Sequence, residues 1–218
     1  MNCCEDATSR KTWRGYAALS AILALAFLLR LYGLSSEPVS LEAYSSVVHL
    51  DPPESYKASP DYERWRVSVQ HEDANSLLAF LEQNRRFDPA TMPLYYTLEY
   101  GWNKYIGHTP LSVRGVSMIL GMLGILGVFW FARMLFGTRA GLLAAMFMAL
   151  SPVHWHYSRE IRMYVLLTLL AVASSYTFLQ FWNDRRKRWW FWHGLANLLL
   201  LWTHPFATLL PFVQGLYV

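Results

Sequence analysis

A short polar segment interrupts the apolar pattern of this chain, and its side chains are of the types that act on phosphate groups. Residues 151–164 read Ser-Pro-Val-His-Trp-His-Tyr-Ser-Arg-Glu-Ile-Arg-Met-Tyr. Arginine forks suit phosphate oxygens, and a carboxylate can orient the arginines or hold a metal ion. Charge this close to a membrane helix is costly unless it is paired or wet. The segment therefore makes a candidate functional vestibule.

Helical spacing determines which of these side chains could act together. If a helix begins at Ser158, Glu160 and Tyr164 share one face four residues apart. Arg159 and Arg162 then lie three residues apart on a neighbouring stripe, so that all four side chains point into one outer vestibule. The alternative is that both arginines extend to lipid headgroups and Glu160 merely neutralises them. Taken alone, the segment favours this second interpretation.

Three histidines add to the candidate chemistry. His204 stands at the outer end of an apolar stretch and precedes Pro205. A lone histidine in that position is more often an interfacial residue than a ligand. His154 and His156 form a His-x-His pair, which is weak evidence for zinc because no cysteine and no evident third ligand accompany it. The sequence identifies no cofactor, and a divalent cation held by Glu160 is left open.

Long apolar stretches predict the elements that position these groups. The chain has 54% apolar and 16% charged residues, a balance suited to lipid. A helix needs roughly 20 apolar residues to cross about 30 Å of hydrocarbon. The expected spans are about 16–34, 113–136, the short 140–153, 163–182 and 189–203, followed by a truncated apolar segment at 206–218. We predict an all-α, polytopic transmembrane protein with a cytoplasmic tail over 1–14 and a transmembrane domain over 15–218.

The distribution of charge predicts the orientation. Lysine and arginine accumulate in short cytoplasmic loops. With the N-terminus inside, all three inner segments are basic, through Arg10, Lys11 and Arg14, then Arg133 and Arg139, then Arg185, Arg186, Lys187 and Arg188. The outer loop over about 35–112 holds eleven of the fifteen acidic residues. The net charge of +4 therefore reflects membrane topology and argues against a nucleic-acid partner.

The N-terminal region raises two further questions. Arg30 and the bulky run over residues 31–34 stand where a signal peptide would have small cleavage-site residues, so we expect the first span to be retained. Cys3 and Cys4 lie in the cytoplasmic tail, so no disulfide framework is expected. We expect an unstructured tail, with reversible lipidation of the cysteines as the alternative.

The large outer loop contains three predicted amphipathic helices, near residues 41–48, 77–86 and 93–105. A connection of about 75 residues either carries function or is disordered, and this one favours order. In the third helix Leu94, Leu98, Trp102 and Tyr105 form one apolar stripe opposite a charged back. Aromatic faces of this kind lie well in the bilayer interface, so the helices would form a platform over the outer face of the membrane.

Several motifs, taken in order, resemble one family over about residues 27–214. Residues 157–164 resemble a Tyr-Ser-Gln-Glu-Ala-Arg-Met-Tyr signature, and residues 41–45 resemble Asp-Glu-Ala-Tyr-Ser. Residues 92–96 are similar to the end of His-Pro-Pro-Leu-Tyr-Tyr, and residues 202–206 to Tyr-Thr-His-Tyr-Phe. The motifs are similar to those in the N-terminal half of the GT-C class of polytopic glycosyltransferases. Within that class they resemble the bacterial branch related to protein O-mannosyltransferases and lipid A aminoarabinose transferases.

The resemblance implies transfer of a sugar from a polyprenyl-phosphate donor to a lipid, protein or glycan acceptor, at the outer face of the cytoplasmic (inner) membrane and with inversion at the sugar. Cationic groups would stabilise the leaving phosphate while a carboxylate deprotonates the acceptor hydroxyl. The implied catalytic carboxylates are Glu42, as the base, and Glu160, which orients the site or a metal. The implied substrate-binding residues are Tyr44, Arg159, Arg162, Tyr164 and His204, with Arg162 and His204 facing the phosphate.

Two departures from the family pattern keep other functions open. Leu41 replaces the aspartate of the first outer loop, and Thr91 and Met92 replace a His-Pro pair. Because relatives carry roughly twice as many residues and spans, we expect this chain to be part of a longer enzyme, or else a truncated, non-catalytic subunit or scaffold. A transporter is less favoured, because carriers place polar residues near the bilayer midplane, whereas the second to fourth spans here read as apolar through their centres.

Overall fold

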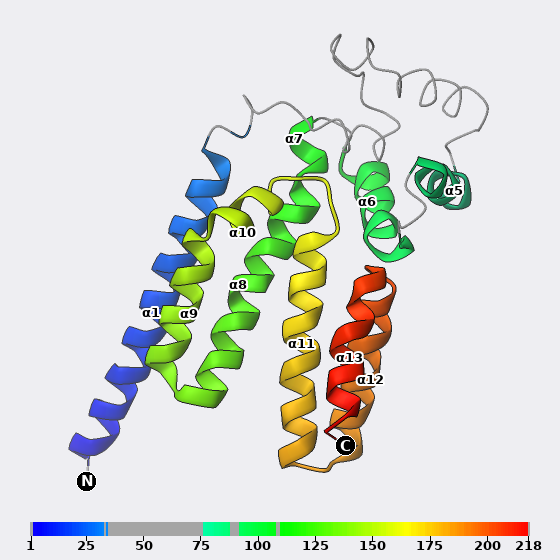
Figure 1. The fold of residues 1–218 in the computed structure, drawn as a ribbon. Coiled ribbons are helices and arrows are strands. Elements are labelled where there is room, and N and C mark those ends of the chain that lie inside the picture. Colours follow the sequence, from blue (N-terminus) through cyan, green and yellow to red (C-terminus); the bar gives the residue numbers. More distant parts are fainter. Residues whose placement is uncertain (1, 33, 35–75, 88–91, 108–109, 218) are drawn as a thin grey trace.

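The computed structural model describes residues 2–32, 34, 76–87, 92–107 and 110–217, and in these ranges the chain is helical with no strand. The long helices α1 (Asn2–Leu31), α8 (Gly115–Phe136) and α11 (Tyr164–Asn183) run alongside one another, together with the shorter α9 (Thr138–Leu150) and α12 (Lys187–Leu201) (Figure 1). The predicted all-α, polytopic class is confirmed. The expected unstructured tail is wrong, since α1 already begins at Asn2.

In the described part of the chain, three helices are long and apolar enough to cross a membrane: Trp13–Leu31, Leu111–Phe136 and Tyr164–Asn183. The third and fifth predicted spans are helices too, but α9 has 13 residues and α12 has 15. At about 1.5 Å per residue they are about 20 and 22 Å long, less than the hydrocarbon thickness of about 30 Å. Prediction and structure therefore agree on three full spans, and α9 and α12 need their flanking residues to cross.

The connections between the helices lie at two opposite ends of the bundle. The start of α1, the α8–α9 turn and the α11–α12 connection lie at one end, where Arg133, Arg139 and Arg185 are found (Figure 1). Gly137 makes the α8–α9 turn with a φ of 86°, a left-handed conformation that glycine adopts without strain. Helices α6 (Pro93–Tyr105), α7 (Pro110–Val113) and α10 (Pro152–Tyr157) lie at the opposite end. The basic connections and the polar segment are thus at opposite ends.

One side of the bundle is held by close contacts among α1, α8 and α9. Its apolar cluster contains Leu19, Ile22, Ala26, Ile125, Phe129, Ala145 and Ala149. Small residues at such crossings let helix backbones approach closely, which is how helices associate in lipid. A second cluster at the other end joins α6, α8 and the segment before α11, through Phe80, Tyr95, Tyr96, Val113, Val116, Ile161, Met163 and Leu166.

Gly141 of α9 lies directly against the backbone of α8, which yields a first prediction. A Cβ atom at this position would stand 2.8 Å from the carbonyl oxygen of Phe129 and 3.0 Å from the Cβ of Arg133. Because these atoms cannot rotate away, Gly141→Ala should push the helices apart and lower the free energy of unfolding by about 1–3 kcal/mol. Thermal unfolding of the purified chain in detergent micelles measures the change.

The matched control for this prediction is Gly194→Ala in α12. A Cβ at Gly194 meets nothing within 4 Å. Alanine is favoured over glycine inside a helix by up to about 1 kcal/mol, so this variant should be neutral or slightly stabilised. Equal unfolding temperatures for the two variants would contradict the close approach of α8 and α9.

A cluster of polar side chains joins α11, α12 and α13 (Leu209–Gly215) inside the bundle. Ser174 Oγ donates to Asn197 Oδ1 at 2.6 Å, and Gln214 Nε2 donates to Ser174 Oγ at 3.1 Å. Ser174 stands in the middle of α11, so the interpretation that this span is apolar through its centre is wrong. The side chains satisfy one another across helices, as polar groups in lipid must.

Two of the three helices predicted in the outer loop are present. The second is α5 (Leu77–Phe87), and the third is α6, with the predicted bounds and Pro93 as its first residue. Proline is suited to this position because the N–H that it lacks has no partner inside a helix. The first predicted helix, at 41–48, lies outside the described residues.

Helix α6 packs through Tyr95 and Tyr96 and through part of its apolar stripe. Tyr95 and Tyr96 are buried against α8 and the segment before α11, and Leu94 and Trp102 of the stripe pack against the same cluster. Leu98 and Tyr105 are exposed and available to lipid, but the expected solvated back is wrong at Glu99. This side chain has 0% exposure, and both its carboxyl oxygens lack a hydrogen-bond partner among the residues that the structure describes. Burial raises the pKa of Glu99 well above its usual value, which favours the neutral acid.

Candidate functional site

The polar segment connects α10 to α11 without being helical itself. Helix α11 begins at Tyr164, and residues 158–163 form turns and bends, so the helix expected from Ser158 is absent. Two features explain the difference. The backbone N–H of Arg159 donates to the carbonyl of His156, three residues earlier, at 3.0 Å, so the helical bonding of α10 ends in a tighter turn. Ile161 and Met163 are then buried in the apolar cluster that contains Tyr95 and Tyr96, which fixes the path of the segment.

Burial alternates along this segment. Arg159, Ile161 and Met163 are buried, and the residues that follow each of them, Glu160, Arg162 and Tyr164, are partly exposed. The accessible members are therefore a carboxylate, a guanidinium group and a phenol. This grouping differs from the expected one, because the helical stripes on which Arg159 was paired with Arg162 do not form.

Arg159 packs on α10. Its guanidinium carbon lies 4.2 Å from the centre of the Trp155 ring, a cation–π contact, and the residue is 3% exposed. The alternative in which both arginines extend to lipid headgroups does not fit Arg159, because its side chain is enclosed by protein. Arg162 is partly exposed and is the arginine that can meet a ligand.

A further buried arginine fixes the start of the segment. Arg30, at the end of α1, donates from Nε to Ser158 Oγ at 2.8 Å and from Nη2 to His154 Nδ1 at 2.7 Å. Its Nη1 donates to a carbonyl oxygen one turn earlier in α1, at 2.9 Å. Trp155 Nε1 donates to the carbonyl of Leu29 at 2.9 Å. These bonds attach α10 to α1 across more than 120 residues of sequence.

The contact with Arg30 determines the state of His154. Arginine is always a donor, so Nδ1 of His154 accepts and Nε2 carries the ring proton. Nδ1 is then occupied, while the ring of His156 packs edge-on against Tyr157 with centres 5.2 Å apart. Among the described residues no three His, Cys, Asp or Glu side chains gather to hold a metal ion. The His-x-His pair therefore does not form a zinc site with the described residues, and Glu160 belongs to no group of three such ligands among them.

His154 yields a prediction about pH. Burial, and secondarily the charge of Arg30, lower the pKa of His154 from 6.5 to about 4. The unfolded chain therefore binds a proton that the folded chain excludes between about pH 6.5 and 4, and stability falls as the pH is lowered through this window, by about 2–3 kcal/mol in all. Unfolding temperatures measured across the window test this. His154→Gln should flatten the dependence and His156→Gln should not, whereas equal slopes in both variants would contradict the assignment.

Three aromatic side chains from different elements meet beside the segment. Tyr157 of α10 and Tyr164 of α11 have ring centres 4.5 Å apart, and Tyr164 and His204 have ring centres 6.2 Å apart. His204 follows α12, and its Nδ1 accepts from the N–H of Phe206 at 3.1 Å, which caps the short helix η1 (Pro205–Thr208). Nε2 of His204 is thus the ring nitrogen that can face a ligand. The structure brings His204 next to Tyr164, although about 40 residues separate them.

The remaining candidates divide between the described and undescribed parts of the chain. Glu42 and Tyr44 lie outside the described residues. Glu160 lies near α6, since its charge is the smallest of the causes that raise the pKa of Tyr95, after burial, Glu99 and Tyr96. The hydroxyl of Tyr95 is hydrogen-bonded to Ser117 Oγ at 2.7 Å, which opposes that rise. Glu160 is therefore on the side of the segment that faces the outer loop.

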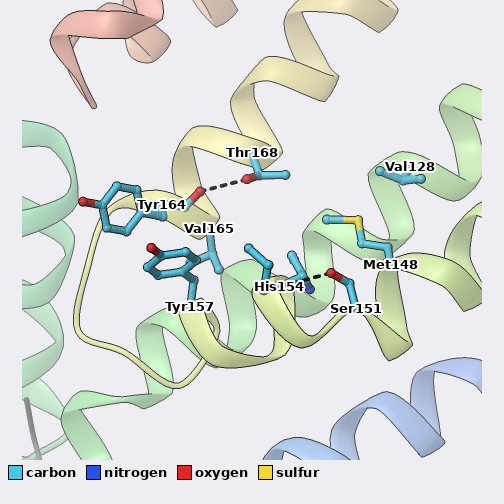
Figure 2. Close-up of a pocket in the computed structure, with 9 residues that line it drawn as sticks. Val128, Met148, Ser151, His154, Tyr157, Tyr164, Val165 and Thr168 are labelled. Atoms are coloured by element: carbon cyan, nitrogen blue, oxygen red, sulfur yellow. Dashed lines mark hydrogen bonds between the residues drawn. The ribbon is translucent and has the colours of Figure 1, made fainter.

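A pocket of about 350 Å³ lies next to the aromatic side chains (Figure 2). It is bordered by α8, α9, α10 and α11, through Val128, Met148, Ser151, Val153, His154, Tyr157, Tyr164, Val165 and Thr168. Tyr157 and Tyr164 belong both to this pocket and to the aromatic group with His204. The sequence did not predict the pocket.

The fold and the site define a polytopic helical membrane protein with charged, phenolic and imidazole groups at one end of its bundle. Residues 93–216 match the family described as dolichyl-phosphate-mannose-protein mannosyltransferase. The match covers more than half of the chain, so this chain belongs to that family of glycosyltransferases, which use a polyprenyl-phosphate sugar donor. The resemblance drawn from the motifs is confirmed. A search of curated proteins and a search of solved structures found no match.

Family membership also decides a point that the fold left open. The polar cluster around Ser174 removes one argument against a transporter, because it places polar groups inside a span. The match to a mannosyltransferase family covers α8, α9, α11 and α12 together with the polar segment, and it favours group transfer.

Proposed function

We propose that this chain forms part of an enzyme that transfers a sugar from a polyprenyl-phosphate donor to an acceptor at the outer face of the cytoplasmic membrane. The observation that supports this most is the grouping of Glu160, Arg162, Tyr164 and His204 near one end of the bundle, within the residues that match the family. These groups come from the segment before α11 and from the end of α12. Their chemistry suits a phosphate leaving group and a hydroxyl acceptor.

In the proposed reaction, an acceptor hydroxyl attacks the anomeric carbon of the sugar from the side opposite the phosphate. The bond from that carbon to the phosphate oxygen breaks, a bond to the acceptor oxygen forms, and the configuration inverts. Arg162 and Nε2 of His204 stabilise the charge that develops on the lipid phosphate. Glu42 takes the hydroxyl proton, and Glu160 orients Arg162. Arg159 has a supporting part in this scheme, since it holds the segment against Trp155.

The orientation in this proposal comes from the basic residues. Arg133, Arg139 and Arg185 lie at the end of the bundle where α1 starts, opposite the polar segment (Figure 1). Positive charge of this kind marks the cytoplasmic side. The polar segment and the outer loop then face the periplasm or the cell exterior.

The proposal is tested with sealed membrane vesicles of both orientations that contain the full-length product of the gene. Each preparation receives a labelled sugar on a polyprenyl phosphate carrier and a membrane-impermeant acceptor. Transfer is expected in vesicles whose original outer face is exposed and not in inverted ones, and Glu42→Gln should lower it. Transfer in inverted vesicles alone would contradict the proposed orientation.

A non-catalytic subunit is the second candidate, and Leu41 is the observation that favours it. The family motif that residues 41–45 resemble has an aspartate at this position, and leucine cannot exchange a proton or orient a cation. This candidate predicts that the donor binds to the protein but that no sugar is transferred unless a partner protein is added. The vesicle assay, repeated with the purified protein alone, separates the two functions.

A further inference from the structure

Two adjacent polar groups on the buried face of α6 lack a hydrogen-bond donor. Glu99 and Asn103 lie one helical turn apart on this face, with 0% and 4% of their surface exposed. Both carboxyl oxygens of Glu99 and Oδ1 of Asn103 have no hydrogen-bond partner among the described residues. Buried polar atoms are nearly always paired in folded proteins, so two neighbouring acceptor groups without a donor point to a missing proton.

A proton on Glu99 would satisfy both groups. Side chains four residues apart on a helix are neighbours, about 5–6 Å between their Cβ atoms, so the carboxyl of Glu99 can reach the amide of Asn103. A carboxylate only accepts hydrogen bonds, whereas a protonated carboxyl has an O–H that donates to an amide oxygen. Burial raises the pKa of Glu99 well above its ordinary value, which favours this neutral form.

The groups around Glu99 do not stabilise a negative charge on it. The titratable and charged side chains on this face of α6 and on the elements near it are Tyr95 and Tyr96 of α6, Arg114 before α8, Arg159, Glu160 and Arg162 of the polar segment, Glu82 and Arg85 of α5, and His204 after α12. None of them is hydrogen-bonded to Glu99. The pKa of Tyr95 is raised by burial, then by Glu99, and least by Glu160, so both carboxyls act on the same face. Like charges disfavour each other, which adds to the cost of ionising Glu99.

Helix α6 also contacts both parts of the candidate site. The backbone N–H of Leu94 donates to the carbonyl of Trp202 at 3.2 Å, two residues before His204. The hydroxyl of Tyr96 donates to Sδ of Met163 at 3.9 Å, at the end of the polar segment. Release of α6 from the bundle would therefore loosen the polar segment and the end of α12 together.

We propose that Glu99 keeps its proton while α6 is docked, donates it to Asn103 Oδ1, and makes the docking of α6 sensitive to pH. When α6 is released, Glu99 is in water and ionises near its ordinary value of 4.5. The docked state therefore binds more protons than the released state from this pH up to the raised pKa. Docking weakens about tenfold for each pH unit across that window, and it is constant below and above it. This inference does not depend on the sugar transfer proposed above.

The test is hydrogen–deuterium exchange of the full-length protein in detergent micelles, from about pH 5 upward. Protection factors, which correct for the intrinsic effect of pH on exchange, are compared for peptides over residues 93–105. Protection of wild-type α6 should fall about tenfold per pH unit until Glu99 is ionised in the docked state. Glu99→Gln should keep constant protection, because glutamine cannot ionise and its amide can donate to Asn103 Oδ1. Glu82→Gln, on the exposed side of α5, is the matched control and should follow the wild type.

Peptides from α8 provide an internal reference and should show no such change in any of the three proteins. The measurement is local to α6, which separates this effect from the opposite effect of His154 on global stability. Constant protection of wild-type α6 would mean that the amide of Asn103 donates to an ionised Glu99, and equal slopes in wild type and Glu99→Gln would mean that another group titrates. Either result would overturn the proposal.

A second measurement on the wild type keeps the proposal open to contradiction if Glu99→Gln does not fold. At about pH 6, exposed carboxyl groups are ionised, so a protonated buried carboxyl is detected by its infrared C=O stretching band. This band should disappear over the same pH range in which α6 loses protection. Absence of the band at about pH 6, or its loss in a different pH range, would contradict the assignment.

Discussion

Replacing Glu160 by glutamine in the full-length protein is expected to lower the rate of sugar transfer by about 10²-fold, the usual effect of misplacing a group that must be oriented for the reaction. Glutamine keeps the size of the side chain and removes its charge. The loss is expected because Glu160 is the acidic residue among the accessible members of the polar segment. Arg162 and Tyr164, the other accessible members, follow it at alternate positions. In the proposed mechanism, Arg162 then loses the group that orients it toward the phosphate.

The matched control is Glu82→Gln in α5. Glu82 also belongs to the outer part of the chain, but it is paired at the surface with Arg85, at 3.0 Å from Oε2 to Nε. Surface ion pairs contribute little, about 0–1 kcal/mol, so this variant should keep its activity within a few-fold. Initial transfer rates in detergent-solubilised membranes measure both variants. Equal rates for the two would remove Glu160 from the proposed site.

Arg30→Met is expected to cause the largest loss of stability, about 3 kcal/mol of the free energy of unfolding. Arg30 is fully buried and supplies the donors that satisfy Ser158 Oγ and His154 Nδ1. Methionine fills much of the same space but leaves these acceptors without a partner. The attachment of α10 to α1 is then weakened, and the polar segment loses its fixed starting point.

Arg139→Met provides the comparison for Arg30. Arg139 is exposed at the opposite end of the bundle, so its replacement should change stability by no more than about 0.5 kcal/mol. Arg30→Lys should fall between the two, because lysine keeps the charge but cannot reproduce the planar fork of donors. Thermal unfolding in micelles ranks the three variants. Equal unfolding temperatures for Arg30→Met and Arg139→Met would show that the buried hydrogen bonds do not hold the helices together.

The helices that sequence predicts well are those with a strong local signal. The spans α8 and α11 follow directly from the length of their apolar stretches, and α6 begins at Pro93 and ends at Tyr105 as predicted. Proline at a first helical position and continuous apolar runs act within a few residues, so they can be identified without knowledge of the fold. The apolar stretches of α9 and α12 have polar flanks, so the sequence indicates the lengths of these two helices less directly.

The site depends on contacts between distant residues, and there sequence reasoning was less successful. The spacing of Glu160 and Tyr164 is compatible with a helix, but burial of Ile161 and Met163 against α6 holds the segment in turns. Glu99 was expected on a solvated face of α6, and its burial follows from the packing of Tyr95 and Tyr96. Neither contact leaves a periodic signal in the sequence.

One signal in the sequence could have located the cluster around Arg30. A charged residue inside a membrane span is costly, and it normally has a partner or a function. Arg30 argues against signal cleavage, and its place inside a span also calls for a buried partner. That partner, His154, is 124 residues away in the sequence, so spacing alone could not identify it.

The most direct test of the central claim is photo-crosslinking of the full-length protein with a polyprenyl phosphate that carries a photoreactive group next to its phosphate. The protein is then digested, and the labelled peptides are identified by mass spectrometry. The account predicts adducts in residues 157–164 and around His204, reduced by an excess of unlabelled sugar donor. Adducts confined to the opposite end of the bundle, around residues 184–188, would show that the donor phosphate does not bind at the polar segment and would contradict the proposed site.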